Sequence, residues 1–359
     1  MQHILVTGAA GFIGSAVARH LNARGDKIVV LDALTYSGRR ENLAQLAGSE
    51  NFIFVEGSIA DQACVNKVFE QYRPRAVLNL AAETHVDRSI SGPAAFVTTN
   101  INGVFELLNA SLAYWQTLTG TDRDSFRFVQ ISTDEIYGAI DEGLADEDAP
   151  LKANSPYSAT KAGGDLLVRS FHETYGLPTV TTRGCNAYGP RQFPEKLIPL
   201  HILRGLSGQS LPIYGNGSNI REWIHVDDAA AGIVAALDRG TPGEAYNLGT
   251  SDLHTNIVLA NHLCRHIDRH SGRADGATAR KIEFVVDRPG HDTRYAMNSA
   301  KARAHLNWQP RISLDDGLRA TVAWYVDNPD WWTPITRGRY DLSRLGATAA
   351  VAKQTAHQS

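Results

Sequence analysis

Short apolar runs alternate with helical patterns and glycine-rich turns along the first half of the chain. The runs are rich in Val, Ile, Leu and Phe, as is typical of parallel strands that are buried on both faces. After the first run, Ile13, Val17 and Leu21 recur at the spacing of one helix face. The runs that predict strands cover residues 3–7, 27–32, 52–59, 76–82, 126–133 and 179–190, the last breaking up at Asn186, and a helix is predicted over residues 99–115.

The first strand, turn, helix and strand form a βαβ unit, whose strands pair in parallel. The fold class that follows is α/β, with a Rossmann-type doubly wound parallel sheet. After about residue 190, prolines and glycines become frequent, which indicates a smaller, irregular C-terminal lobe and a ligand site in the cleft between the lobes. We expect a dinucleotide-binding domain that carries the catalytic residues over 1–190, a substrate-binding lobe with some chain crossing over 191–332, and a loosely ordered tail over 333–359.

The composition narrows the class of protein. Of the 359 residues, 43% are hydrophobic and 20% charged, and the net charge of −3 gives no reason to expect nucleic-acid or membrane binding. No apolar run approaches the roughly 20 residues that span a bilayer, and the chain enters its first strand without a signal peptide. Cys64, Cys185 and Cys264 are widely spaced, which favours a reducing cytoplasm and argues against a disulfide framework or a metal site.

Gly8, Gly11 and Gly14 form a GxxGxxG turn between the first strand and the first helix. Glycine permits the tight turn, the close approach of backbone N–H groups to a pyrophosphate and close helix–strand packing. The helix N-terminus also favours the phosphate charge. Asp32 ends the second strand, where a carboxylate can bind both ribose hydroxyls and would repel a 2′-phosphate. The pattern predicts NAD as the cofactor.

Tyr157 and Lys161 lie four residues apart in YSATK, so they share one face of a helix. An ammonium group beside a phenol lowers the pKa of the phenol, which can then take a hydroxyl proton while hydride leaves the same carbon. The spacing is common on helix surfaces, but here it follows a dinucleotide-binding pattern and a strand that ends in Ser132 and Thr133. We therefore expect Tyr157 and Lys161 to be catalytic, with Thr133 bonded to the same substrate hydroxyl.

Asp134 and Glu135 follow that strand directly, so two carboxylates stand at its end. Adjacent like charges and burial raise the pKa of one member of such a pair, which keeps one carboxyl protonated near neutral pH. The alternative is a solvated acidic turn.

Seven segments carry a resemblance to a known family. With the glycine turn and the YxxxK motif, the chain resembles the extended short-chain dehydrogenase/reductase superfamily and, within it, the family of dTDP-glucose 4,6-dehydratases, over roughly residues 2–332. The segments are LDALTYSGRREN, AAETHVDRSISGPAAF, STDEIYG, SPYSATKAGGD, YGPRQFPEKLIPL, LPIYGNGSNIREWIHVDD and DRPGHDTRYAMN. The acidic pair is the most specific feature, because related epimerases and decarboxylases of nucleotide sugars lack it.

The resemblance implies an NAD-dependent lyase that acts on a nucleotide sugar, needs no metal and forms a homodimer through long helices. After oxidation at C4 of the glucosyl group, Glu135 would remove the C5 proton and a neutral Asp134 would protonate the C6 hydroxyl as water leaves. Hydride then returns to C6. The residues implied for NAD binding are Gly8, Gly11, Phe12, Ile13, Gly14, Asp32, Ser58, Ile59, Leu80, Ala81, Ala82, Thr99, Tyr157 and Lys161. Those implied for the nucleotide sugar are Thr84, Thr133, Asn186, Lys196, Leu197, Pro212, Tyr214, Arg221, Asn256, Asp287, Arg288 and His291.

Two departures from the family pattern concern the ligands. Ser58 stands where the family has an Asp that accepts from the adenine amino group, and Ala187 stands where it has an Asn near the nicotinamide. We therefore expect NAD to be held less firmly than in relatives. The TTRG segment at residues 181–184 resembles UDP-glucose 4,6-dehydratases, so thymine and uracil both stay open as the base.

The cofactor, the role of His85 and the function each keep a rival interpretation. Arg39 and Arg40 follow Asp32 closely and leave NADP as the second choice of cofactor. His85 is either a structural histidine or a ligand of the substrate, for which Thr84 is the better candidate. A nucleotide-sugar epimerase or decarboxylase, and a non-catalytic NAD-sensing protein with a degenerate site, are the rival functions.

Overall fold

The large sheet has the strand order of a doubly wound fold. In the computed structural model, which describes residues 2–343 and 345, seven strands lie in the order β10-β6-β5-β4-β1-β2-β3, and all neighbours are parallel. The chain moves outward in both directions from β1 and β4, so their carboxyl ends form the switch point where ligands bind in such sheets. The strands are β1 (Ile4–Thr7), β2 (Ile28–Asp32), β3 (Phe52–Glu56), β4 (Ala76–Asn79), β5 (Arg127–Thr133), β6 (Thr179–Gly184) and β10 (Ala245–Leu248). The predicted Rossmann-type α/β fold is confirmed.

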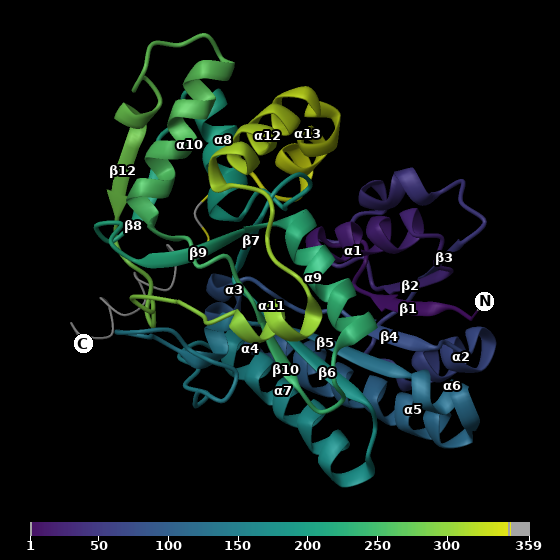
Figure 1. Cartoon of the computed structure of the whole chain (residues 1–359). Coiled ribbons are helices and arrows are strands. Elements are labelled where there is room, and N and C mark those ends of the chain that lie inside the picture. Colours follow the sequence, from purple (N-terminus) through teal and green to yellow (C-terminus); the bar gives the residue numbers. More distant parts are fainter. Residues whose placement is uncertain (1, 344, 346–359) are drawn as a thin grey trace, which may run out of the picture.

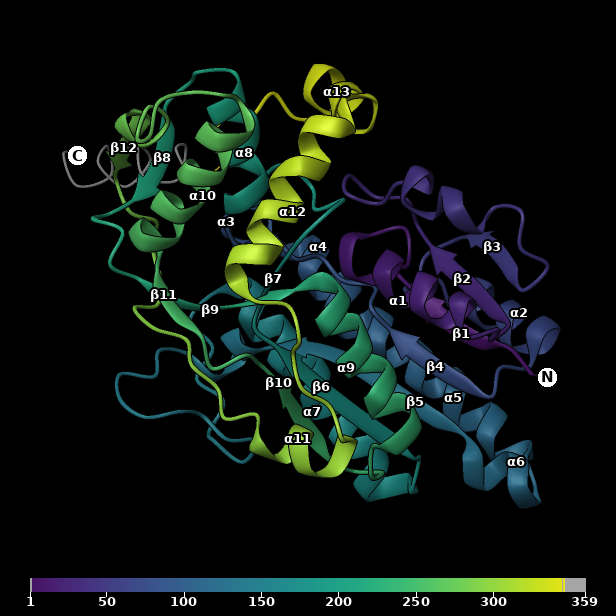
Figure 2. The same cartoon turned by 45° about the horizontal axis from the view of Figure 1, so that its top comes forward.

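Helices cover both faces of this sheet (Figures 1 and 2). Successive residues of a strand point to opposite faces, so Leu5 packs into one core cluster and Ile4 and Val6 into the other. The helices on the Leu5 face are α2 (Gln62–Tyr72), α5 (Val104–Thr117) and α7 (Pro156–Tyr175). Those on the opposite face are α1 (Phe12–Ala23), α9 (Val226–Arg239), α11 (Ala300–Leu306) and the 3₁₀ helix η1 (Arg40–Leu46). The shorter connecting elements are α3 (Val86–Ser91), α4 (Pro93–Val97), the π-helical turn η2 (Thr98–Gly103), α6 (Gly120–Ser125) and η3 (Asp134–Tyr137).

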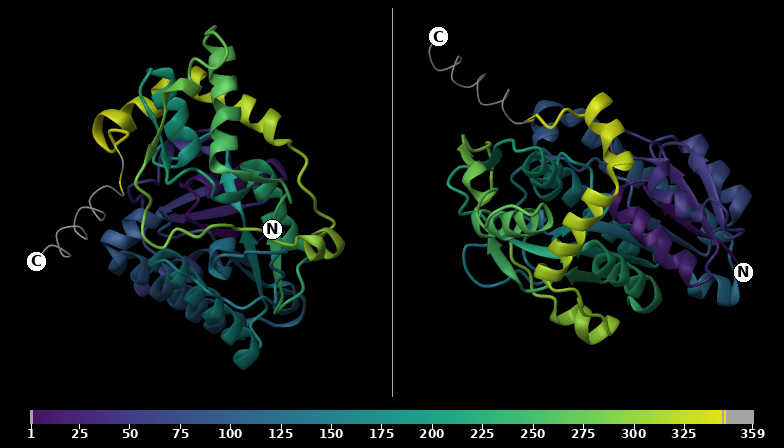
Figure 3. Two further views of the ribbon diagram at one scale, coloured as in Figure 1. Left: turned by 90° about the vertical axis from the view of Figure 1, so that its left-hand side faces the viewer. Right: turned by 90° about the horizontal axis from the view of Figure 1, so that it is seen from above.

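The second lobe is built from small sheets and helices around a core of its own (Figure 3). One small sheet has the order β11-β9-β7 and the other pairs β12 with β8. Its buried core includes Leu203, Trp223, Leu263 and Tyr325. The elements are β7 (Asn186–Tyr188), α8 (Leu197–Leu206), β8 (Leu211–Tyr214), β9 (Ile220–His225), β11 (Leu253–Thr255), α10 (Asn256–His270), η4 (Ala279–Lys281), β12 (Ile282–Val285), α12 (Leu314–Asp327) and α13 (Pro329–Gly338).

The chain crosses between the lobes more than once. After β9 it returns to the large sheet as α9 and β10, and α11 returns again to pack on α9 and β10. The lobes are therefore not consecutive segments, and the division at residue 190 stays a prediction. None of the helices in the described part of the chain is long and apolar enough to cross a membrane.

Two local expectations differ from the structure. The sequence predicts a buried β3, but this strand lies at the sheet edge and pairs with β2 alone, so its residues are half-buried or exposed. The loosely ordered tail expected from residue 333 is wrong for residues 333–343. Trp331 and Ile335 lie four apart on α13 and are buried with Tyr340 and Leu342 in the core of the second lobe. Residues 344 and 346–359 of that expected tail lie outside the described residues.

Candidate active site

The glycine turn lies at the switch point of the large sheet. Gly8 has a left-handed φ of 68°, and a Cβ atom at this position would lie 2.5 Å from the backbone nitrogen of Ala81, two residues after the end of β4. A Cβ on Gly14 would lie 2.2 Å from the carbonyl oxygen of Gly8. Side chains are therefore excluded where the turn meets β4 and where α1 begins, and the backbone is left open to a pyrophosphate.

Asp32 stands at the end of β2 and is nearly buried. Its Oδ2 accepts from the backbone N–H of Ala10 at 2.8 Å, and its Oδ1 accepts from that of Leu34 at 2.8 Å. Burial raises the pKa of Asp32, whereas these two N–H groups act in the opposite direction. These two bonds fix the carboxylate of Asp32 in the wall of the cavity that starts at the glycine turn. A ribose bound in this cavity would lie beside it.

Arg39 and Arg40, which made NADP the second choice of cofactor, both pair with glutamates and stack on aromatic rings. Arg39 pairs with Glu41 and stacks over a Trp ring, and Arg40 pairs with Glu56 and stacks over Phe54. Among the described residues, neither arginine lines the cavity beside Asp32. The residues present therefore fit NAD better than NADP.

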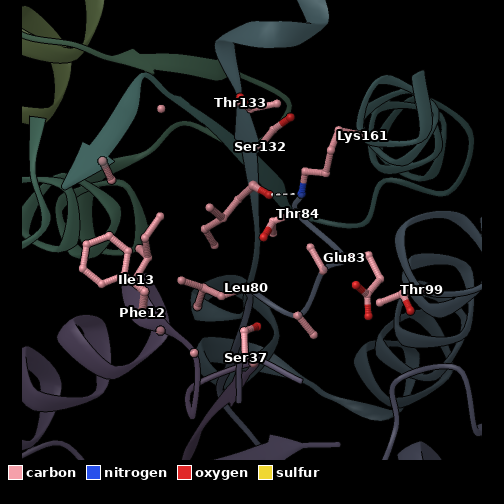
Figure 4. A pocket seen from close by; sticks show the side chains of 18 of the residues that line it. Phe12, Ile13, Ser37, Leu80, Glu83, Thr84, Thr99, Ser132, Thr133 and Lys161 are labelled. Carbon is pink, nitrogen blue, oxygen red and sulfur yellow. Dashed lines mark hydrogen bonds between the residues drawn. The ribbon is translucent and has the colours of Figure 1, made fainter. Parts of the chain in front are cut away.

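A cavity of about 320 Å³ runs from the glycine turn to the end of β5 (Figure 4). All residues that the resemblance implied for the cofactor line it. They are Gly8, Gly11, Phe12, Ile13, Gly14, Asp32, Ser58, Ile59, Leu80, Ala81, Ala82, Thr99, Tyr157 and Lys161. The structure thus brings the whole predicted set together around one space.

Tyr157 and Lys161 enter this cavity from the first turns of α7. The helix starts with Ser155 as N-cap in a capping box with Ser158, which fixes where these side chains emerge. The Lys161 Nζ donates to the carbonyl oxygen of Ile131 in β5 at 2.6 Å, and Figure 4 shows this bond beside Ser132 and Thr133.

The ionisation of this pair differs from the expectation. Burial raises the pKa of Tyr157, and the carboxylates of Glu135 and Asp134 raise it further, whereas a hydrogen bond with Thr133 lowers it. Burial lowers the pKa of Lys161 to about 8, against the attraction of Asp165. The lowering of the Tyr157 pKa by Lys161 is therefore not found, because two neighbouring acids and desolvation dominate.

Asp134 and Glu135 begin the 3₁₀ turn η3 directly after β5. Thr133 donates to Asp134 Oδ1 at 3.1 Å and accepts from the backbone N–H of Glu135 at 3.3 Å, so one hydroxyl orients the turn. Asp134 is 3% exposed, and its Oδ2 is buried without a hydrogen-bond partner among the described residues. Buried polar atoms without partners are rare and often mark function.

The two acids differ in their charged neighbours. Burial raises the pKa of Asp134 well above its usual value, and the carboxylates of Glu135 and Glu222 raise it further. Burial also raises the pKa of Glu135, but Arg288, Lys196 and Arg221 act in the opposite direction. The surroundings therefore favour protonation of Asp134 over protonation of Glu135, which is the order that an acid and a base require.

A second cavity, of about 190 Å³, opens from the same point into the smaller lobe. Ten of the twelve residues implied for the nucleotide sugar line it: Thr84, Asn186, Lys196, Leu197, Pro212, Tyr214, Arg221, Asn256, Arg288 and His291. Thr133 lines the first cavity, and the residues shared by both cavities are Thr84, Glu135, Asn186, Glu195 and Lys196. Glu135 therefore stands where the two spaces meet.

Asp287 is the one implied residue that lines neither cavity. Its Oδ1 lies 2.6 Å from Nδ1 of His291, which does line the second cavity. Asp287 is thus placed to orient His291, and its own contact with a substrate stays a prediction. Thr84 and His85 both line the second cavity, so position alone does not separate the structural and binding roles of His85.

Sequence reasoning missed Glu195, which lines both cavities. Its side chain is 1% exposed; it accepts from the Tyr36 hydroxyl at 2.7 Å and from Arg88 Nε at 3.0 Å. These bonds join the loop after β2 to the smaller lobe. The only signal in the sequence was an acidic residue directly before Lys196, because the partners lie more than 100 residues away.

The two departures from the family pattern both line the first cavity. Ser58 Oγ accepts from the backbone N–H of Ala60 at 3.1 Å, and the Ala187 carbonyl accepts from Gln192 at 2.8 Å. Neither residue offers the carboxylate or amide expected there.

Replacing Ser58 by Asp is expected to tighten NAD binding about tenfold, because a carboxylate can keep the bond to Ala60 and add one to the adenine amino group. Titration of the apoprotein with NAD by calorimetry measures this, with Ser271→Asp, at an exposed serine that lines neither cavity, as the control. A Ser58→Asp protein that binds NAD no better than the parent would contradict the expected contact.

A dinucleotide-binding sheet joined to a YxxxK helix and a small substrate lobe defines an extended short-chain dehydrogenase/reductase. The family model described as GDP-mannose 4,6 dehydratase matches residues 5–321. The chain is 47% identical to the dTDP-glucose 4,6-dehydratase of Xanthomonas campestris pv. campestris (strain B100), covering 96% of this chain and 99% of that one.

Solved structures agree with this relationship. The chain is similar to DesIV, the dTDP-glucose 4,6-dehydratase of Streptomyces venezuelae crystallised with NAD and TDP, with 42% identity, a TM-score of 0.84, and coverage of 93% of this chain and 100% of that one. The UDP-glucose 4-epimerase of Thermotoga maritima is more distant, at 31% identity and a TM-score of 0.80, over 91% and 100% of the two chains. The chain belongs to the nucleotide-sugar 4,6-dehydratase family and, within it, to the dTDP-glucose 4,6-dehydratases.

Proposed function

We propose that the protein converts dTDP-glucose to dTDP-4-keto-6-deoxyglucose and water. The observation that carries this proposal is the placement of Asp134 and Glu135. The two carboxyl groups stand beside Tyr157 at the junction of a dinucleotide cavity and a second cavity in the smaller lobe. An epimerase needs no such pair, because it eliminates no water.

NAD fits the first cavity, with the glycine turn at its pyrophosphate, Asp32 at its ribose, and Tyr157 and Lys161 at its nicotinamide end. Bound NAD would supply the acceptor for the C4 hydride and the donor for its return to C6, and an oxidised nicotinamide would add a positive charge to the site. Such a charge opposes the two carboxylates that raise the pKa of Tyr157.

Tyr157 is the base that takes the C4 hydroxyl proton, and Thr133 bonds the same hydroxyl. Lys161 is fixed by the Ile131 carbonyl, which keeps its ammonium group in the cavity wall. Asp165 lies behind Lys161 and favours its charged form. These groups carry out the first half of the reaction.

Glu135 then removes the C5 proton, which the C4 ketone has made acidic. Arg288, Lys196 and Arg221 favour its ionised form. Asp134, held neutral, gives its proton to the C6 hydroxyl, so that water leaves instead of hydroxide. Since the two acids are adjacent, they titrate together, and the pKa values observed in an experiment are those of the coupled pair.

The second cavity suits the rest of a nucleotide sugar. Arg221 is held by backbone carbonyls, with Nη1 bonded to Ile220 and Nη2 to Asp292, both at 2.8 Å. Burial lowers the pKa of Arg221 because it removes water from the guanidinium charge. A bound anion would stabilise that charge in place of the water. Arg288 also lines this cavity, so two guanidinium groups are available to a diphosphate.

Purified protein should convert dTDP-glucose to a 4-keto product, read from its absorbance in base, at least tenfold more efficiently than UDP-glucose. A higher kcat/KM with UDP-glucose would favour a UDP-glucose 4,6-dehydratase, to which the TTRG segment points. Formation of a C4 epimer without the keto product would rule out both the dTDP-glucose and the UDP-glucose 4,6-dehydratase.

We also propose a cytoplasmic homodimer with the two-lobe division described above. Exposed apolar side chains lie along the outer helices of the large sheet: Phe105 of α5 is 42% exposed, and Leu166 and Tyr175 of α7 are 56% and 51% exposed. A second copy would cover them. The free thiols of all three cysteines support a reducing compartment.

A further inference from the structure

The second cavity has one wall that no sequence motif indicated. Tyr340 and Leu345, which follow the last helix, line it together with residues of α8, β8 and the end of β12. We name residues 339–343 and 345 the C-terminal strap. Tyr340 is 7% exposed, so the strap is built into the lobe.

The strap is fixed at its start by α13. Trp331 donates through Nε1 to Asn42 Oδ1 at 2.8 Å, and Asn42 donates to the carbonyl of Ala10 in the glycine turn at 2.8 Å. Ile335 is fully buried, and its carbonyl accepts from the backbone N–H of Tyr340 at 2.9 Å. The strap therefore starts from a helix that belongs to the second lobe and is bonded to the dinucleotide-binding domain.

Further contacts hold the strap against the smaller lobe. Arg204 of α8 donates to the carbonyl of Leu342 at 3.3 Å, and within the strap the Tyr340 hydroxyl donates to the carbonyl of Ser343. The ring of Tyr340 packs on Phe193 at 6.2 Å between centroids. Tyr214 is close enough to contribute to the raised pKa of Tyr340, after burial and two nearby acids.

The lining of the cavity changes from polar to apolar. Arg221, Arg288 and His291 can meet a diphosphate, while Leu200, Pro212, Ile213, Val285, Tyr340 and Leu345 offer carbon surfaces. A sugar placed at Glu135 with its diphosphate at the arginines leaves its nucleobase for the apolar group. Of these residues, Val285, Tyr340 and Leu345 lie outside the segments that resemble the family, and the strap supplies the last two.

We propose that Tyr340 and Leu345 complete the pyrimidine subsite and favour thymine over uracil. This rests on the function proposed above. Thymine differs from uracil by one methyl group, and an apolar pocket that accepts one extra carbon discriminates by roughly 10- to 200-fold. The apolar strap supplies the surface that a 5-methyl group would bury, and a uracil would leave part of that surface uncovered.

Calorimetric titration of the NAD-saturated protein with dTDP and dUDP tests this, because these ligands differ only in the methyl group. The parent should bind dTDP about tenfold more tightly than dUDP. Leu345→Ala and Tyr340→Leu should each reduce that ratio to about threefold or less, mainly by weakening dTDP. Leu144→Ala, at a leucine that is 48% exposed and lines neither cavity, is the control.

A ratio near one in the parent, or parental ratios in both strap variants with unchanged thermal stability, would overturn the proposal. Because the titration needs no turnover, its outcome is separate from that of the proposed function. If the protein shows the expected binding ratios but forms no 4-keto product, the proposed subsite stands and the proposed dehydratase activity is wrong.

Discussion

Glu135→Gln should lose exchange of the substrate's C5 proton with solvent and reduce turnover by about 10²- to 10⁴-fold, the usual effect of removing a general base. Oxidation at C4 should persist, because Tyr157 and Lys161 remain. Rapid mixing with NAD-loaded protein, read as absorbance of the reduced cofactor, follows oxidation, and deuterium uptake at C5 follows the second step.

Asp134→Asn should fail at a different step. Its amide cannot protonate the C6 hydroxyl, so the ketone should form and exchange at C5 while water leaves slowly. Asp141→Asn and Glu142→Gln are matched controls, since they alter an adjacent pair in the same order that is exposed and lines neither cavity. Equal loss of every partial reaction in both site variants, with folding intact, would rule out the division of roles.

Tyr157→Phe should slow oxidation at C4 by about 10²- to 10⁴-fold, because it removes the hydroxyl that accepts the substrate proton. In the parent, this step should accelerate as pH rises. Burial, Glu135 and Asp134 raise the pKa of Tyr157, so its ionised fraction still grows above neutral pH. The variant should lose that dependence.

Tyr175→Phe on the same helix is the control, because Tyr175 lines neither cavity and Phe keeps the apolar ring that a second copy would cover. Single-turnover formation of the reduced cofactor across pH measures the effect. A Tyr157→Phe protein that oxidises C4 at the parental rate, with the parental pH profile, would exclude Tyr157 as the base.

Local patterns predicted the dinucleotide half of the molecule well. The glycine turn, Asp32 and the YxxxK helix each depend on neighbours within one βαβ unit or one helix turn, so their spacing in the sequence is nearly their spacing in space. The parallel pairing of the large sheet follows from the same alternation, since parallel strands need helical crossovers.

Features that depend on distant contacts were harder to predict. Tyr157 was expected to titrate lower, but its pKa depends on burial and on two carboxylates from another element. Glu195 gains its role from Tyr36 and Arg88. The strap looked polar and loose in sequence, yet a few apolar residues, Tyr340 among them, suffice to fix it in the second core.

The central claim, elimination across C5 and C6 by the acidic pair, is tested most directly by following the hydrogen from C4. With dTDP-glucose deuterated at C4, the deuterium should appear in the C6 methyl group of the product, because the enone is electrophilic at C6. In D₂O with unlabelled substrate, deuterium should enter at C5. Mass spectrometry and NMR of the product measure both positions. Deuterium that stays at C4, or that is lost by exchange with added NADH, would contradict the dehydratase and favour an epimerase.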